Sequence, residues 1–356
     1  MNLKAWEEFC DELKNLGSII ENNAPDRLSR NEGYRYLLRL LRLASEMHFE
    51  HSFPNHASFY SLSNETAKIG GDNPDNVYLN SNLNSSQSYE VTGNIGQASY
   101  LSLGIKENRY HLDGTMISHA EIEITDEHTD NNGDFRILIS QNKEADLIMQ
   151  PSSNMLIVRE TYKSKVTDKR AFLNIRALHQ NSQLPVLSDD ELLEKLNRTL
   201  RFVKGTALTF VSWVDEFKLN HLNSLPLGNQ DFFQAAGGDP SIIYLHGYYQ
   251  IEPDECLQIR TMIPECDLWN FQLENFWMES LDYRFNKIHI NDANAVLDNK
   301  ELIMHITHNI EDLPNNLITQ NHTEGAMLLR WINCKDPIIP EVTKIKLREL
   351  KKIHEP

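Results

Sequence analysis

Two stretches of short β-segments flank one long helical pattern, and this order constrains the fold more than any other feature of the sequence. In residues 188–222 apolar side chains recur at helical spacing, and Ser188 with Glu191 three positions later has the sequence of a capping box. We therefore expect a long helix that joins two β-domains and packs on at least one of them.

The stretches on either side have the turn residues that are typical of antiparallel sheets. Short alternating segments lie between residues 59 and 185 and again between 239 and 347, separated by clusters of Gly, Asn and Asp. Such spacing is typical of β-sandwich or jelly-roll-like sheet pairs. Helical periodicity in residues 3–22 and 31–50 indicates two further helices. We predict an α+β fold of four parts: an N-terminal helical pair (1–55), a first β-domain (56–187), the connecting helix (188–222) and a second β-domain (223–356).

The chain is acidic, and its charge argues against two classes of partner. Its 356 residues include 51 Asp and Glu against 34 Lys and Arg, a formal net charge of −17. A field of this sign repels phosphate backbones and anionic lipid headgroups. We therefore expect neither nucleic acid nor a membrane surface as a partner. Assembly into a homo-oligomer stays open.

The sequence lacks the usual signals for export or for a cofactor. The N-terminal pattern is acidic and amphipathic, unlike a signal peptide, and no apolar run approaches the roughly 18 residues of a membrane span. The four cysteines show no C-x-x-C spacing, and no phosphate loop or dinucleotide fingerprint occurs. We expect a cytoplasmic protein without a cofactor.

Residues 267–283 alternate like a strand whose two faces differ in chemistry. One face carries Trp269 and Trp277, and the other carries Asn270, Gln272 and Glu274. A cleft wall uses successive amides and a carboxylate, whereas an antiparallel sheet often exposes one polar face to water without a functional reason. Both interpretations stay open. Under the first, the amides and the tryptophan rings bind a ligand.

Three residues of the second β-domain are candidates for catalysis. Glu274, held beside tryptophan rings, is expected to have a raised pKa and to act as a general acid or base. His322, in a loop before a strand, shuttles protons under the functional interpretation and caps a turn under the alternative. Arg330 interrupts an otherwise apolar strand, so it needs a carboxylate partner or holds an anionic substrate group.

Residues 72–75 and the histidines at 305 and 308 are two further candidate binding sites. Asp72, Asn73 and Asp75 offer oxygens to a ligand or cation, but an Asx turn is the favoured interpretation because a calcium loop needs more oxygen ligands. In a strand, His305 and His308 point to opposite faces, so they share a metal ion only if the strand ends or bulges between them. We predict no metal site.

Long motifs give the chain a family resemblance. G-G-D-N-P-D-N at 70–76, W-N-F-Q-L-E-N-F-W-M-E-S-L-D-Y at 269–283 and N-H-T-E-G-A-M-L-L-R-W at 321–331 resemble the bacterial family called domain of unknown function 1214. The resemblance covers most of the chain and implies a β-rich, two-part protein, but it brings no catalytic residue. At 314–319 the chain reads P-N-N-L-I-T where members often show P-N-W-[LI]-D-T, so a tryptophan and an aspartate are missing.

These observations favour a protein that binds a small organic molecule in a polar and aromatic cleft. One hypothesis adds acid–base turnover by Glu274 and His322, with Arg330 orienting the substrate. A second is a non-catalytic module that binds a carbohydrate or another flat ligand. A third is an oligomeric scaffold. Convergence of these three residues and Asp72 on one cavity would favour the first two hypotheses.

Overall fold

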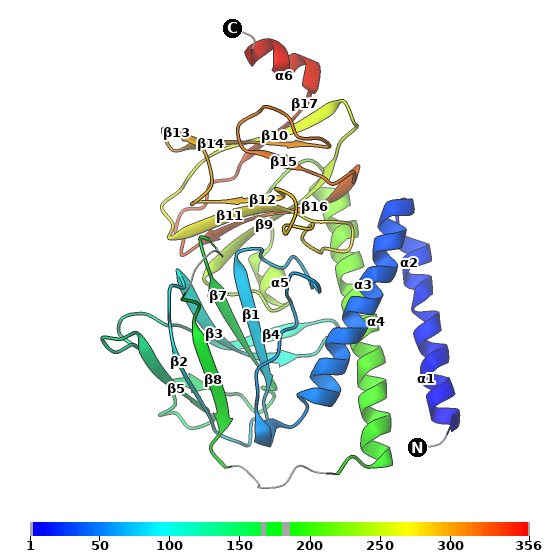
Figure 1. Cartoon of the computed structure of the whole chain (residues 1–356), viewed down its shortest axis with the longest axis vertical. Helices are drawn as coiled ribbons and strands as arrows, with labels where there is room; N and C mark the ends of the chain where they lie inside the picture. The colour runs from blue at the N-terminus through cyan, green and yellow to red at the C-terminus, as the bar shows by residue number, and fades with distance from the viewer. Residues whose placement is uncertain (1–2, 165–168, 180–185, 355–356) are drawn as a thin grey trace.

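The structure, a computed structural model, describes residues 3–164, 169–179 and 186–354. Along the chain it has helices, a first set of β-strands, one long helix and a second set of β-strands (Figure 1). This order confirms the predicted α+β fold. No helix within these described ranges is long and apolar enough to cross a membrane.

The predicted N-terminal helical pair is present, and its first member is divided in two. The periodicity of residues 3–22 belongs to two helices that meet at Leu16. Asp26 starts the next helix because its side chain accepts a 2.7 Å hydrogen bond from the Ser29 amide, as an N-cap does. The helices are α1 (Leu3–Asn15), α2 (Gly17–Asn23) and α3 (Arg27–Ser45), which continues as a π-helical turn over Glu46–Glu50.

The first β-region consists of two four-stranded sheets that share one hydrophobic cluster. The strand orders are β1-β7-β3-β4 and β6-β5-β2-β8, and every pair except β5–β6 is antiparallel. The strands are β1 (Asn76–Asn82), β2 (Tyr89–Asn94), β3 (Tyr100–Asn108), β4 (Met116–Glu123), β5 (Asp134–Ser140), β6 (Leu147–Ile148), β7 (Met155–Thr161) and β8 (Phe172–Ala177).

The connecting helix is confirmed as α4 (Asp189–Asn220). Its capping box forms as predicted, with the Glu191 amide donating to Ser188 Oγ and the Ser188 amide donating to the Glu191 carboxylate. Gly205 is required in mid-helix because a Cβ there would lie 1.9 Å from the carbonyl oxygen of Tyr110. The helix runs alongside both β-regions (Figure 1) and shares a hydrophobic cluster with both, so it holds them together.

The second β-region also has two sheets, ordered β12-β11-β16-β9 and β13-β14-β10-β17, with β15 added parallel to β14. Both sheets contribute to one hydrophobic cluster. The strands are β9 (Ile242–Gln250), β10 (Glu255–Met262), β11 (Leu268–Leu273), β12 (His289–Asn291), β13 (Leu297–Asp298), β14 (Glu301–Thr307), β15 (Asn316–Ile318), β16 (Glu324–Ile332) and β17 (Glu341–Lys346), and the helices of this half are α5 (Gln230–Gln234) and α6 (Leu347–His354).

Three elements differ from the sequence prediction. β1 was not expected, because its N-V-Y-L-N-S-N segment lacks apolar alternation. The strand-like alternation of residues 267–283 forms a strand only as far as Leu273, and Met278 beyond it adopts a positive φ of 53° within a turn. The C-terminal segment, for which no helix was predicted, forms α6.

Candidate functional site

The polar face of β11 continues across two neighbouring strands. Asn270 pairs with Arg330 of β16, which pairs in turn with Tyr244 of β9. Because side chains two residues apart share a face, Gln272 and His246 lie on this face as well. The sheet thus directs amides, a guanidinium, a phenol and an imidazole toward the first β-region.

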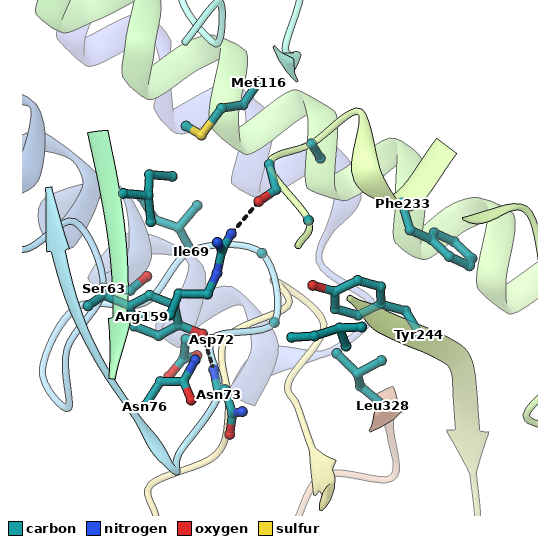
Figure 2. Close-up of a pocket in the computed structure, with 18 of the residues that line it drawn as sticks. Ser63, Ile69, Asp72, Asn73, Asn76, Met116, Arg159, Phe233, Tyr244 and Leu328 are labelled. Atoms are coloured by element: carbon teal, nitrogen blue, oxygen red, sulfur yellow. Dashed lines mark hydrogen bonds between the residues drawn. The ribbon is translucent and has the colours of Figure 1, made fainter. Parts of the chain in front are cut away.

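The facing sheet of the first β-region also carries polar side chains toward the second β-region. Tyr78 of β1 pairs with Arg159 of β7, and Asn80 of the same strand pairs with Ile157. All four line a cavity of about 130 Å³ between the two β-regions. Met116 and Phe233 of α5 also line the cavity (Figure 2). Further lining comes from Phe210 and Trp213 of α4 and from the loop 236–238.

Arg330 lies on this wall without an acidic partner. Its guanidinium donates to Gln272 Oε1 at 2.6 Å, to Asn270 Oδ1 at 3.2 Å and to the Gly71 carbonyl. All three acceptors are neutral, and the side chain forms no ion pair with any described residue. The buried guanidinium lines the cavity and is hydrogen-bonded only to neutral oxygens, although its charge also acts on Glu274 behind the wall.

Arg159, on the opposite wall, is compensated. Its Nη1 lies 3.1 Å from Glu121 Oε1 and 3.7 Å from Asp239 Oδ2, while Nη2 donates to the Gly237 carbonyl at 2.5 Å (Figure 2). Burial alone would raise the pKa of Asp239, but the charge of Arg159 helps to hold it below the usual value. Lys106 neutralises the other oxygen of Glu121 at 2.7 Å.

Two tyrosine hydroxyls at the cavity are fixed by backbone amides. Tyr78 Oη accepts from the Asn73 amide at 3.0 Å, and Tyr244 Oη accepts from the Asp239 amide at 2.9 Å. Burial raises the pKa of Tyr244 to about 12, so the hydroxyl keeps its proton. Each hydroxyl therefore has a proton left to donate.

The segment 70–76 packs onto the polar face of β11. Asn73 forms an Asx turn, because its Oδ1 accepts from the Asp75 amide at 2.9 Å. Asp72 accepts from the amide and hydroxyl of Ser280. Both Asp72 and Asn73 line the cavity, whereas Asp75 lies behind it, where its carboxylate accepts from the Asn270 and Asn291 amides at 2.9 Å each.

The polar face of β11 is buried, not solvated. Asn270 is 2% exposed, and Gln272 and Glu274 are fully buried. Asn270 donates to Asn73 Oδ1 at 2.5 Å, and Gln272 donates to the Asp72 carbonyl at 2.8 Å. These amides therefore fix both the cavity loop 70–76 and Arg330.

Glu274 is buried immediately behind the cavity wall. A Cβ on Gly71, which lines the cavity, would lie 2.8 Å from Glu274 Oε1. That oxygen accepts from Gln272 at 2.7 Å, while Oε2 has no partner among the described residues. Burial raises the pKa of Glu274 to about 7, although the charge of Arg330 opposes the shift. The group is poised to hold a proton near neutral pH.

His322 belongs to a different network. Its Nδ1–H donates to the Thr319 carbonyl at 2.9 Å, and its Nε2–H donates to Glu32 of α3 at 2.7 Å. Burial would lower the pKa of His322, but the bond to Glu32 outweighs this, and the pKa is raised. Because both ring nitrogens face acceptors, the imidazolium ties α3 to the second β-region and does not line the central cavity.

The two tryptophans predicted to bind a ligand lie in apolar packing instead. Trp269 packs on Trp331 with ring centroids 6.2 Å apart. Trp277 packs on Tyr36 of α3, and its Nε1–H donates to the Ser29 carbonyl at 2.7 Å. The structure therefore brings Arg330, Asp72 and Asn73 to the cavity wall. Asn270, Gln272, Glu274 and Asp75 lie behind that wall in one hydrogen-bonded network, whereas His322, Trp269 and Trp277 lie elsewhere.

Sequence reasoning missed Arg159, Tyr78 and His246. Arg159 stands in M-L-I-V-R-E-T, and a lone arginine in an apolar strand was the signal that identified Arg330. His246 alternates with Tyr244 along β9, so the polar spacing of this strand was also visible. Tyr78 gave no such signal, because β1 itself was not predicted.

The histidines of β14 and its following loop form hydrogen bonds separately. His305 contacts the Pro314 carbonyl and Gln258, and His308 contacts Thr319 and the Ile251 carbonyl. Among the residues that the structure describes, no group of three or more His, Cys, Asp or Glu side chains is arranged to hold a metal ion.

A second cavity, of about 480 Å³, lies between the α4 N-terminus and the first β-region. Most of its charged side chains bond to nearby residues. Glu191 caps α4, Glu194 accepts from Arg198 at 2.9 Å, and Lys195 donates to the His48 carbonyl at 3.1 Å. The central cavity, with an uncompensated buried cation, is the stronger candidate for a binding site.

Comparison with solved structures finds matching chains. An uncharacterised protein from Burkholderia cenocepacia shares 35% sequence identity, a TM-score of 0.93 and coverage of 97% of each chain. A protein from Vibrio parahaemolyticus shares 12% identity at a TM-score of 0.49, over 93% of this chain and 100% of that one. No family model and no curated protein matches the sequence, so the resemblance to domain of unknown function 1214 stays a prediction.

Proposed function

The chain belongs to the same family as the Burkholderia cenocepacia protein, and we propose that it binds a small organic anion in the central cavity. The observation that carries this proposal is Arg330, a buried guanidinium whose hydrogen-bond partners are all neutral. Burying such a charge without a counterion costs roughly several kcal/mol of folding free energy, and a bound anion would offset this cost. A ligand carboxylate would do so, and the guanidinium geometry suits it.

The size and lining of the cavity restrict the ligand. A volume of about 130 Å³ is close to that of an engineered cavity, roughly 150 Å³, that binds benzene. Phe210, Trp213 and Phe233 offer aromatic surface to a ring. Tyr78 and Tyr244 supply hydroxyl donors near the anionic group. The favoured ligand is therefore an organic anion about the size of one ring.

Benzoate and its uncharged analogue benzamide test this proposal. Thermal unfolding of the full chain should shift upward with benzoate concentration, as expected for a ligand that binds only the folded state, and benzamide should have a much smaller effect. The benzoate shift should disappear in Arg330→Met. It should persist in Arg176→Met, which removes an exposed arginine on the other sheet of the first β-region. Equal shifts with both compounds would overturn the proposal.

Turnover of the bound molecule is a second candidate function, and Glu274 favours it. Its Oε2 has no partner among the described residues, and its pKa of about 7 suits a general acid. One residue, Gly71, separates it from the cavity. Glu274→Gln should retain benzoate binding and abolish any conversion of bound carboxylates that nuclear magnetic resonance detects in the wild type. Conversion at an unchanged rate would exclude Glu274 as the acid.

A further inference from the structure

A polar cavity of about 220 Å³ lies between α3 and the segment 275–286 that follows β11. Most of the side chains that line it are charged or carry an amide, whereas the central cavity has aromatic walls. Three of the lining residues are cations: Arg35 and Arg39 of α3, and Lys68 of the loop before β1. Because the whole chain has a formal net charge of −17, a cluster of three cations at one cavity is a local feature of this site.

The two arginines of this cavity have unused hydrogen-bond donors. They lie one turn apart on α3, so they project from the same face of the helix. Arg39 Nη1 donates to Glu279 at 2.6 Å, and Arg35 Nη2 donates to Glu32 at 2.9 Å. Neither guanidinium forms another hydrogen bond with the residues that the structure describes. Both side chains are accessible, Arg39 at 14% and Arg35 at 51%, so the remaining N–H groups are open to a bound molecule.

Asn275 holds the two ion pairs side by side. This residue is 2% exposed, and its Nδ2 donates to Glu32 and to Glu279 at 3.0 Å each. Each of these carboxylates binds one of the arginines. One buried amide therefore places both guanidinium groups on one wall of the polar cavity.

Lys68 adds a buried cation that has no carboxylate in ion-pair contact among the described residues. Its ammonium donates to the Ser280 and Leu281 carbonyls, and a further donor of this group has no oxygen acceptor in the part of the chain that the structure describes. Burial lowers the pKa of Lys68; nearby carboxylates oppose the shift, and the charge of Arg39 adds to it. Lys68 and Arg39 are thus close enough to act on each other.

The carboxylates of the polar cavity do not balance its cations. They are Glu32, Glu279 and Asp282, and each already has a cation in ion-pair contact. Two of them also bind cations from outside the wall, since His322 contacts Glu32 and Arg284 contacts Asp282. When His322 is charged, the lining residues and their ion-pair partners therefore carry two more cations than carboxylates.

We propose that the polar cavity binds the phosphate group of a small phosphate monoester. Such a group has a charge of about −1.5 to −2 at pH 7 and three terminal oxygens, which match the excess charge and the three lining cations. Guanidinium groups bind phosphate oxygens in pairs, and an ammonium group adds a point charge. Phe285, 78% exposed at this cavity, offers apolar surface to the organic part of the ester. No described residue lines both this cavity and the central one, so the proposal is independent of the proposed function.

Calorimetric titration of the full chain with methyl phosphate at pH 6.5 tests this proposal. At this pH His322 is charged, because its pKa is raised above 6.5. One molecule of methyl phosphate should bind, and acetate, which brings a single charge, should bind about tenfold more weakly or less. Both ligands are also titrated into Arg330→Met, which removes the cation of the central cavity. The affinity for methyl phosphate should not change in that variant.

Variants of the lining cations assign the binding to this cavity. Arg35→Gln and Lys68→Met should each weaken methyl phosphate binding by about tenfold or more, because each removes a charged donor. Arg30→Gln removes an exposed arginine of the same helix that does not line the cavity, and it should change the affinity by no more than about twofold. Arg35 is half exposed, so Arg35→Gln serves if Lys68→Met does not fold.

The contrary outcomes are distinct. Absence of methyl phosphate binding to the wild type would overturn the proposal, and loss of binding in Arg330→Met would place the phosphate in the central cavity instead. Equal weakening by Arg30→Gln and Arg35→Gln would mean that only diffuse charge attracts the ligand. Equally tight binding of acetate, or of malonate with its two separate carboxylates, would overturn the assignment to phosphate. The benzoate shift should persist in Arg35→Gln, so this proposal and the proposed function fail separately.

Discussion

Arg159 and Arg330 face one cavity from opposite sheets, both in strands that are otherwise largely apolar, yet the protein compensates their charges differently. Arg159 has two carboxylates, Glu121 and Asp239, within ion-pair distance. Arg330 is hydrogen-bonded to three neutral oxygens. An ionised Glu274 would compensate its positive charge, but burial raises the pKa of Glu274 to about 7. The difference separates an arginine that stabilises the fold from one that is available to a ligand.

The first prediction concerns stability at the compensated arginine. Arg159→Met should lower the free energy of unfolding by about 3–5 kcal/mol, because it leaves Glu121 and Asp239 buried with an incomplete set of cations. Urea denaturation at pH 7 measures the change. Arg176→Met, which removes an exposed arginine from Glu90, should cost no more than about 1 kcal/mol. A loss at Arg159 as small as the control would show that this cluster is not structural.

The second prediction concerns the uncompensated arginine. Arg330→Met should cost at most about 2 kcal/mol, less than Arg159→Met, because the loss of hydrogen bonds to neutral oxygens is partly offset by removal of a buried charge that has no carboxylate in ion-pair contact. Binding of benzoate should be lost. The same urea experiment measures the stability change. If the two arginine variants exchange their order, the comparison between them is wrong, and Arg330 is the structural member of the pair.

The third prediction uses pH to sharpen the comparison. The folded pKa of Glu274, about 7, lies above its ordinary value of 4.5, so between these pH values the folded state retains a proton that the unfolded state releases. Its contribution to folding stability therefore decreases as pH rises from 4.5 to 7, by up to about 1.4 kcal/mol per pH unit. Glu274→Gln should remove this slope. The free energy of unfolding of both proteins is measured across that pH range. Parallel curves for wild type and variant would contradict a proton held on Glu274 in the folded state.

Local patterns predicted the frame of the molecule. The Ser188 capping box and the long apolar face gave α4, and alternation gave most strands of both β-regions. β1 was not predicted because Asn76 and Asn80 are buried polar residues whose hydrogen-bond partners, Thr161 and the Leu62 amide, lie on another strand and a loop. A polar residue reads as exposed until those partners are known.

The candidate site was predicted only in part, for a related reason. The amide residues of β11 were identified from the alternation along that segment, and Arg330 of β16 was identified because it interrupts an otherwise apolar strand. The choice between a solvated face and a buried one depended on residues 70–76, which bond to Asn270 from 195 and 197 positions away. His322 was assigned to the same site because its partner, Glu32, lies 290 positions earlier and no local pattern connects the two.

The smallest expected effect on stability is at His322, which shares features with both arginines. Like Arg159 it is a buried cation with a carboxylate partner, Glu32, but its charge titrates. The pKa of His322 is raised above 6.5, and its stabilising effect is complete below that pH and is lost as pH rises through the raised value. Burial would raise the pKa of Glu32, but the bond to His322 lowers it below 4.5, so its contribution is present above 4.5 and is lost as pH falls through the lowered value.

The pair is therefore most stabilising between pH 4.5 and 6.5. His322→Gln, which keeps one donor toward Glu32, should cost about 1–2 kcal/mol in this window and less at pH 8. The difference in unfolding free energy between wild type and variant, measured at pH 5.5 and at pH 8, checks this. A difference that grows toward pH 8 would mean that His322 acts as a neutral ring, and its assignment as a charged link between α3 and the second β-region would be wrong.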